Sequence, residues 1–151
     1  QALDKYVKKG DSVLDVGCGS GILSIDALKL GAAHATAIDI DEVAVKVAAE
    51  NMDVNHIPAS QYTLFDGDLI TNSFLKVKAG TGHDIVVANI LADVIIPLTG
   101  VIRPHLKKGG LYITSGIINT KEEEVREALI ANGFEILGVE YMKEWCCFIA
   151  K

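Results

Sequence analysis

The sequence predicts an α/β fold in which a mostly parallel sheet of about seven strands lies between two layers of helices. Three observations carry this prediction. Short apolar runs alternate with amphipathic stretches, which is typical of parallel strands joined by right-handed crossover helices. Polar residues stand at the ends of four apolar runs, where ligands bind in such sheets: Asp15, Asp39, Asp68 and Asn89. The last two apolar runs stand at hairpin spacing, which predicts antiparallel strands at the end of the chain.

The first half of the chain supplies three of these strands. Residues 13–16 form a short apolar run, and apolar positions at helical spacing then predict a helix over 22–30. Residues 35–40 read as a second buried strand. Asp41 is the expected N-cap of the next helix, whose apolar residues share one face. Residues 61–65 form a third, weaker strand.

The second half begins with a strand that is apolar throughout. Residues 85–88 have the composition of a strand covered on both faces. We expect a helix over 91–106 despite Pro97, which is tolerated early in a helix or kinks it. Two lysines and two glycines at 107–110 then predict a helix end and a turn, before a fifth strand at 111–114.

The end of the chain differs in kind. Thr120 and Glu123 have the spacing of a capping box, so we expect a helix that runs to about residue 131. Two strand-like runs follow, at 134–141 and 145–149. Only three residues separate them, which predicts a hairpin. In total we expect about seven strands and about five helices.

Length and charge set further bounds. The chain has 151 residues, half of them hydrophobic, which is the size of one domain with one core. Its formal net charge of −6 argues against general electrostatic binding of nucleic acid, because phosphate binding needs clustered lysine and arginine. We therefore expect no direct nucleic-acid binding.

The apolar runs and the cysteines suggest the compartment. No apolar run approaches the roughly 20 residues of a membrane helix, so no membrane partner is expected. The three cysteines, Cys18, Cys146 and Cys147, are an odd set with an adjacent pair and make a poor disulfide framework. We expect a reducing, cytoplasmic location.

A glycine-rich turn follows the first strand and opens a helix. Gly17, Gly19 and Gly21 permit positive φ and close approach of a ligand to the backbone. The dinucleotide fingerprint needs a glycine where this chain has Ile22, and Asp15 before the turn would repel a pyrophosphate. A cationic cofactor without phosphate, such as S-adenosylmethionine, fits this turn better than NAD.

Further residues near the turn are candidate cofactor contacts. Asp39 ends the second strand, where its carboxylate can accept both ribose hydroxyls; a helix cap is the alternative. Ile40 would then flank the adenine, and either Asp68 or Asp66 would accept from the adenine amino group. Cys18 belongs to the turn through its backbone, and a nucleophilic role for its thiol is disfavoured.

Five segments of the chain together match a known family. They are Asp-Val-Gly-Cys-Gly-Ser-Gly-Ile-Leu-Ser at 15–24, Ala-Ile-Asp-Ile-Asp at 37–41, Val-Ala-Asn-Ile-Leu-Ala at 87–92, Ser-Gly-Ile-Ile at 115–118 and Glu-Trp at 144–145. Over essentially its whole length the chain resembles class I S-adenosylmethionine-dependent methyltransferases. The Asn-Ile-Leu and Ser-Gly-Ile segments make it similar, more narrowly, to the ribosomal protein L-eleven methyltransferase family.

The resemblance implies a Rossmann-like methyltransferase sandwich and a function. It implies methyl transfer from S-adenosylmethionine to amino groups of a large-subunit ribosomal protein, including lysine side chains and the N-terminal amine. The side-chain oxygen of Asn89, or the backbone oxygen of Ile90, would accept an N–H bond and aim the amine. Asn89 would also contact the cofactor, and Ile90 and Leu91 would supply apolar walls.

Two departures from the family pattern are large, and a third is mild. The family has a small N-terminal substrate-recognition domain and a Gly-Thr-Gly-x-His-x-Thr-Thr segment upstream of the point where this chain begins. The first residue is Gln1 rather than Met, so we expect a missing N-terminal portion and interpret residues 1–151 as the S-adenosylmethionine-binding catalytic domain alone. Glu42 stands where the family usually has Pro, a mild change at a helix start.

Other functions remain open at this point. A nucleobase amino group or a small molecule is an alternative methyl acceptor, and a non-catalytic cofactor-binding module is a second alternative. Trp145 is expected to pack in the core or at the sheet edge. The four histidines show no metal-ligand spacing, so no metal site is expected: His34, His56, His83 and His105.

Overall fold

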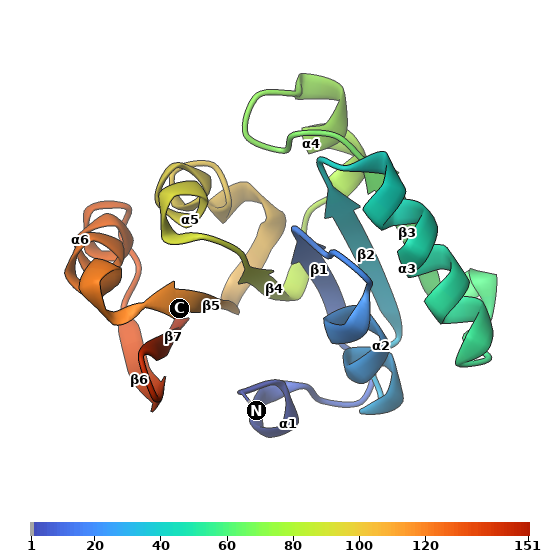
Figure 1. Ribbon diagram of the computed structural model, residues 1–151, viewed down its shortest axis with the longest axis horizontal. Helices are drawn as coiled ribbons and strands as arrows, with labels where there is room; N and C mark the ends of the chain where they lie inside the picture. Colours follow the sequence, from blue (N-terminus) through green and yellow to red (C-terminus); the bar gives the residue numbers. More distant parts are fainter. Residues whose placement is uncertain (1) are drawn as a thin grey trace.

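The computed structural model describes residues 2–151 and confirms the expected α/β architecture (Figure 1). Seven strands form one sheet in the order β3-β2-β1-β4-β5-β7-β6. Pairing is parallel from β3 across to β5, and antiparallel where β7 joins β5 and β6. The strands are β1 Ser12–Val16, β2 His34–Asp39, β3 Tyr62–Asp66, β4 His83–Asn89, β5 Leu106–Ile118, β6 Ile136–Met142 and β7 Trp145–Ala150.

Helices cover both faces of the sheet. On one face Leu3, Ile25 and Met52 contribute to a core cluster beneath the first three helices. On the other face Leu75 and Leu129 belong to a larger cluster beneath the last three. The helices are α1 Ala2–Tyr6, α2 Ile22–Lys29, α3 Glu42–Val54, α4 Ser73–Ala79, α5 Ala92–Thr99 and α6 Glu122–Ala131, with short 3-10 turns η1 Ala59–Gln61, η2 Arg103–His105 and η3 Asn119–Lys121.

The central strands are buried on both sides, which explains their unbroken apolar sequence. In β4, Ile85 and Val87 pack in the α1–α3 layer, whereas Val86 and Ala88 face the α4–α6 layer. Alternate residues of a strand point to opposite faces, so both sets must be apolar. The expected cap of α3 is also present, because the Asp41 side chain accepts a hydrogen bond of 2.9 Å from Val43 N.

The helix expected over 91–106 is present at Ala92–Thr99 with Pro97 inside it, but its expected end is wrong. Helix α5 ends at Thr99, and β5 begins at Leu106, so residues 107–110 lie in the strand and not in a turn. Ile102 and Leu106 are apolar at helical spacing, but they reach the core from a turn and from the first residue of β5. Leu106 pairs with His83 of β4 and Leu111 pairs with Ile85, with a register shift between them, so residues 107–110 are an irregularity within β5 rather than the end of a helix.

Three smaller differences concern helix ends and short helices. The capping box at Thr120 is wrong: α6 begins at Glu122 and its N-cap, Lys121, makes no side-chain cap hydrogen bond. Helices α1 and α4 were not expected, because they have only 5 and 7 residues and carry little periodic pattern. The hairpin is confirmed, with β6 beginning at Ile136 rather than residue 134. No helix of residues 2–151 is long and apolar enough to cross a membrane.

Candidate functional site

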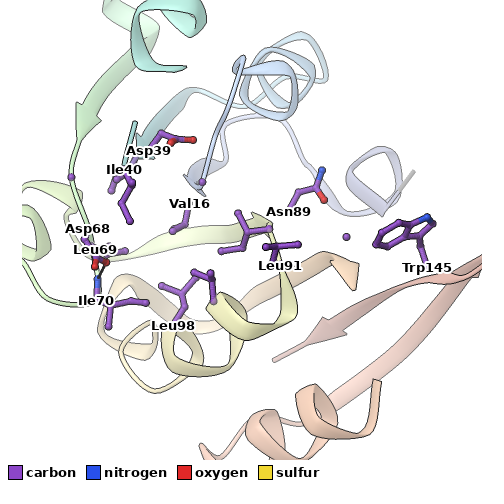
Figure 2. Close-up of a pocket in the computed structure, with 16 residues that line it drawn as sticks. Val16, Asp39, Ile40, Asp68, Leu69, Ile70, Asn89, Leu91, Leu98 and Trp145 are labelled. Atoms are coloured by element: carbon purple, nitrogen blue, oxygen red, sulfur yellow. Dashed lines mark hydrogen bonds between the residues drawn. The ribbon is translucent and has the colours of Figure 1, made fainter. Parts of the chain in front are cut away.

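A pocket of about 610 Å³ opens at the carboxyl ends of the central strands (Figure 2). Its volume lies within the range of small-molecule sites, roughly 300–1,000 Å³. Figure 2 shows Asp39, Ile40 and Asp68 toward one end, and Asn89, Leu91 and Trp145 toward the other. The lining residues are Val16, Gly17, Ile38, Asp39, Ile40, Gly67, Asp68, Leu69, Ile70, Asn89, Ile90, Leu91, Val94, Leu98, Gly116 and Trp145.

The glycine loop between β1 and α2 is tied to β2. The backbone N–H groups of Gly17 and Cys18 both donate to Ile38 O, at 2.8 and 2.9 Å. The next N–H group, that of Gly19, donates to Asp39 Oδ2 at 2.8 Å. The loop therefore takes its shape from the end of the neighbouring strand.

The three glycines of this loop are required for different reasons, although all have positive φ. A Cβ on Gly17 would overlap Ile90 Cγ2, so this glycine allows the loop to touch the segment after β4. A Cβ on Gly21 would lie 3.1 Å from Ala48 Cβ, against α3. A Cβ on Gly19 would meet no described residue within 4 Å, so open space lies above the loop there.

Each carboxylate oxygen of Asp39 accepts one backbone hydrogen bond. Oδ2 accepts from Gly19 N, and Oδ1 accepts from Asp41 N at 2.9 Å. A carboxylate has about four lone-pair sites, so two remain for a ligand in the pocket. Ile40 is 68% exposed and offers an apolar surface next to it. Asp39 therefore stabilises the glycine loop through Gly19 N and also lines the pocket.

Asp68 and Asp66 differ in position. Asp68 lines the pocket, and its Oδ1 accepts from Ile70 N at 2.9 Å. Asp66 ends β3 and does not belong to the lining. Of the two expected candidates, Asp68 is the one that faces the cavity.

Asp15 and Cys18 lie behind the loop rather than in the pocket. Asp15 is 1% exposed, and its Oδ2 accepts from Ser24 Oγ at 2.7 Å. Burial raises the pKa of Asp15 to about 6, and the charge of Asp39 adds to this in a smaller way. Burial likewise raises the pKa of Cys18 to about 12, so its thiol is neutral and makes a poor nucleophile.

The other end of the pocket carries neutral groups. Asn89 is the last residue of β4, and the exposed side chain of Leu91 follows it. Trp145, expected in the core or at the sheet edge, is instead 43% exposed and lines this end (Figure 2). Gly116 lies against Asn89, since a Cβ on Gly116 would be 2.6 Å from Asn89 Oδ1.

The family model and the curated relatives indicate one family. The family model for ribosomal protein L11 methyltransferase (PrmA) matches residues 1–151. The chain belongs to this family. The protein of that name from Lachnoclostridium phytofermentans is 46% identical over 163 residues, covering 99% of this chain and 49% of that protein. The one from Agathobacter rectalis is 50% identical over 147 residues, covering 95% and 46%.

Solved structures extend the comparison to the fold. A ribosomal protein L11 methylase from Lactobacillus delbrueckii subsp. bulgaricus superposes with a TM-score of 0.89 at 32% identity, covering 99% of this chain and 73% of that one. A putative methyltransferase solved in complex with SAH shares the fold at a TM-score of 0.83 and 15% identity, covering 99% and 47%. The chain spans about half the length of the curated relatives above.

Sequence reasoning located seven of the pocket residues and missed others. Gly17, Asp39, Ile40, Asp68 and the 89–91 segment line the pocket as expected, whereas Asp15, Cys18, Gly19 and Gly21 do not. The missed members come from the α4–α6 face and the last strands. A Ser-Gly-Ile triplet inside a strand was the available indication of Gly116, because glycine in a strand often marks a close approach. The missed residues are Val16, Ile38, Gly67, Leu69, Ile70, Val94, Leu98, Gly116 and Trp145.

Proposed function

We propose that this protein transfers methyl groups from S-adenosylmethionine to amino groups of a large-subunit ribosomal protein. The chemistry of the pocket lining is the observation that carries this proposal. It contains two carboxylates, of Asp39 and Asp68, and no lysine or arginine among the described residues. Such a lining suits a cofactor with positive charge and no phosphate, and it opposes a pyrophosphate.

The residues at the Asp39 end fit the cofactor. The two free lone-pair sites of Asp39 would accept the ribose hydroxyls. Ile40 and Ile70, which line the pocket, would offer apolar surface to the adenine, and Asp68 would accept from its amino group. The open space above Gly19 leaves room for the methionine part, whose positive charge the buried Asp15 would attract from behind the loop.

The residues at the Asn89 end fit an amine. S-adenosylmethionine supplies a methyl group that a neutral amine nitrogen takes as the carbon–sulfur bond breaks. A free lysine has a pKa of about 10.4 and is mostly protonated at neutral pH. The apolar side chains of Leu91 and Trp145 would remove water and favour the neutral amine. The oxygen of the Asn89 amide, or that of the Ile90 backbone, would then accept an N–H bond and aim the lone pair.

The names of the relatives supply the acceptor in this proposal. Both curated relatives and the methylase from Lactobacillus delbrueckii carry ribosomal protein L11 in their names. Because the two curated relatives are about twice as long as this chain, residues 1–151 would form the catalytic domain. The three cysteines are free thiols, in keeping with a cytoplasmic protein.

Two measurements test the proposal. Both use the intact protein, including any segments that lie outside residues 1–151. Calorimetry should show binding of S-adenosylmethionine and its demethylated product and none of NAD. Mass spectrometry should show added methyl groups on purified ribosomal protein L11, with an RNA oligonucleotide and free lysine as competing acceptors. Tight NAD binding without response to either sulfur compound would overturn the cofactor assignment. Methylation of RNA or free lysine alone would overturn the acceptor, and no methylation at all would favour a cofactor-binding module.

A further inference from the structure

Strand β5 departs from regular pairing beside the pocket. It pairs with β4 in parallel up to Asn89, which lies opposite Ser115. On its other side, the antiparallel register with β7 shifts between Thr114 and Ile117. Gly116 lies within this shift and has a φ of +75°, a conformation that residues with a Cβ rarely adopt. Such an irregularity re-aims the chain at the edge of a site.

The irregularity brings Gly116 against both oxygens that the proposed mechanism offers to the amine. A Cβ on Gly116 would lie 2.6 Å from Asn89 Oδ1 and 3.5 Å from Ile90 O. Real Cβ atoms essentially never approach another atom as closely as the first distance. The Asn89 side chain therefore keeps its present position only while residue 116 is glycine.

We propose that Gly116 is a positioning residue for methyl transfer, which sets the placement of the Asn89 amide and keeps the space beside Ile90 O open to the amine. The inference rests on the proposed function. Gly116 lines the pocket and lies against Asn89, and Figure 2 shows Asn89 at the opposite end of the pocket from Asp39. A side chain at position 116 thus disturbs acceptor alignment more than cofactor binding.

Another glycine provides a matched control. Gly82 has a φ of +71°, close to that of Gly116, but a Cβ on it would meet no described residue within 4 Å. It lies just before β4 and does not line the pocket. Alanine at Gly82 therefore introduces the same backbone strain without the contact.

The test compares Gly116→Ala, Gly82→Ala, Asn89→Ala and the double variant Asn89→Ala/Gly116→Ala in the intact protein. We expect Gly116→Ala to lower kcat by about tenfold or more and to change the affinity for the demethylated cofactor by less than about threefold. Gly82→Ala should lower the melting temperature and leave kcat unchanged. In the double variant, the loss of kcat should be clearly smaller than the product of the two single losses, because both act on one group.

Each other outcome has a defined meaning. Parental kcat in Gly116→Ala, or losses that multiply in the double variant, would overturn the inference while the Asn89 role stands. Parental kcat in Asn89→Ala would overturn both the Asn89 role and this inference. If Gly116→Ala does not fold, the double variant should fold, because the contact with Oδ1 is gone. A double variant that also fails to fold, beside a folded Gly82→Ala, would show that the contact is not the cause and would overturn the inference.

Discussion

The two ends of the pocket differ in how their residues are held. At the Asp39 end, which is the proposed cofactor end, Asp39 accepts from Gly19 N and Asp41 N, so hydrogen bonds join the segments that follow β1 and β2. At the Asn89 end, which is the proposed acceptor end, Asn89 lies against Gly116 of β5 and lines the pocket together with Trp145 of β7. The first end is held by hydrogen bonds between the segments that follow β1 and β2, whereas the second depends on close packing with residues of β5 and β7.

The ends also differ in charge. Asp39 and Asp68 line the first, with Asp15 buried behind its loop, whereas the second is neutral and largely apolar. This division suits a reaction that binds a cation at one end and needs an uncharged amine at the other. Variants should therefore separate binding from turnover according to the end that they alter.

Gly17→Ala should have the largest effect, because Gly17 contacts both ends. Its positive φ and the overlap of a new Cβ with Ile90 Cγ2 should together lower the free energy of unfolding by about 2–4 kcal/mol. Cofactor affinity and kcat should fall together. Urea denaturation measures the free energy of unfolding, and calorimetry measures the cofactor affinity. Gly10→Ala, with positive φ and no described residue within 4 Å of its Cβ, is the control, and an equal loss in both variants would show that the Ile90 contact is unimportant.

The raised pKa of Asp15, behind the glycine loop of the cofactor end, predicts that the stability of the fold depends on pH. Its pKa is raised from 3.8 to about 6 on folding, so between these values the folded state holds the proton more tightly. Its ionisation should therefore reduce stability as pH rises from about 4 to 7, by about 3 kcal/mol in all. The groups around it are the neutral Ser24, the neutral thiol of Cys18 and the carboxylate of Asp39.

Asp15→Asn tests that expectation. The amide keeps an acceptor for Ser24 Oγ but carries no charge, so the variant should lack this part of the pH dependence. Urea midpoints from pH 4 to 7.5 measure the difference between the variant and the parent. Identical pH profiles for the two proteins would contradict the raised pKa.

Asp39→Ala sharpens the comparison at the cofactor end. Loss of a charged acceptor for two hydroxyls should weaken cofactor binding by roughly ten- to a hundredfold, or about 1.5–3 kcal/mol. Asp41→Ala is the control, since Asp41 caps α3 through Val43 N and should cost about 1 kcal/mol of stability with little change in affinity. Equal affinities in the Asp39 variant and the parent would favour a purely structural role for Asp39.

Thr114→Val should have the smallest effect, and in the opposite direction. Thr114 Oγ1 is buried in β5 without a hydrogen-bond partner among the described residues. Valine has nearly the same shape, so removal of the hydroxyl should raise stability by about 1 kcal/mol. Thr99→Val should instead lower it, because Thr99 Oγ1 donates to Ile95 O at 2.7 Å. Thermal melts compare the two, and a loss of stability in Thr114→Val would contradict this account.

The sequence allowed prediction of the cofactor end better than of the acceptor end. Glycine positions, strand ends and the Asp41 cap are encoded within a few residues, so β1, α2, β2 and α3 were predictable. The end of α5 and the length of β5 were not, because Ile102 and Leu106 satisfy a helical pattern locally while pairing with β4 decides the outcome. Trp145 was misassigned for the same reason, since its exposure depends on the register of β7 with β5.

The charge state and orientation of single side chains also could not be predicted from the sequence. Asp15 stands in the same motif as Gly17, but only the fold shows that it turns toward Ser24 rather than into the pocket. Spacing along the chain places a residue near a site, whereas packing decides which way its side chain points.

The most direct test of the central claim is the separation of binding from turnover in Asn89→Ala, measured in the intact protein at saturating cofactor. The account predicts that affinity for the demethylated cofactor stays within about threefold of the parent while kcat and kcat/KM for the ribosomal protein fall together. Asn89→Asp should also be slow, because a carboxylate would hold the amine as its ammonium ion. Near-parental turnover in both variants, or a loss of cofactor affinity that matches the loss of turnover, would contradict the division of the pocket into two ends.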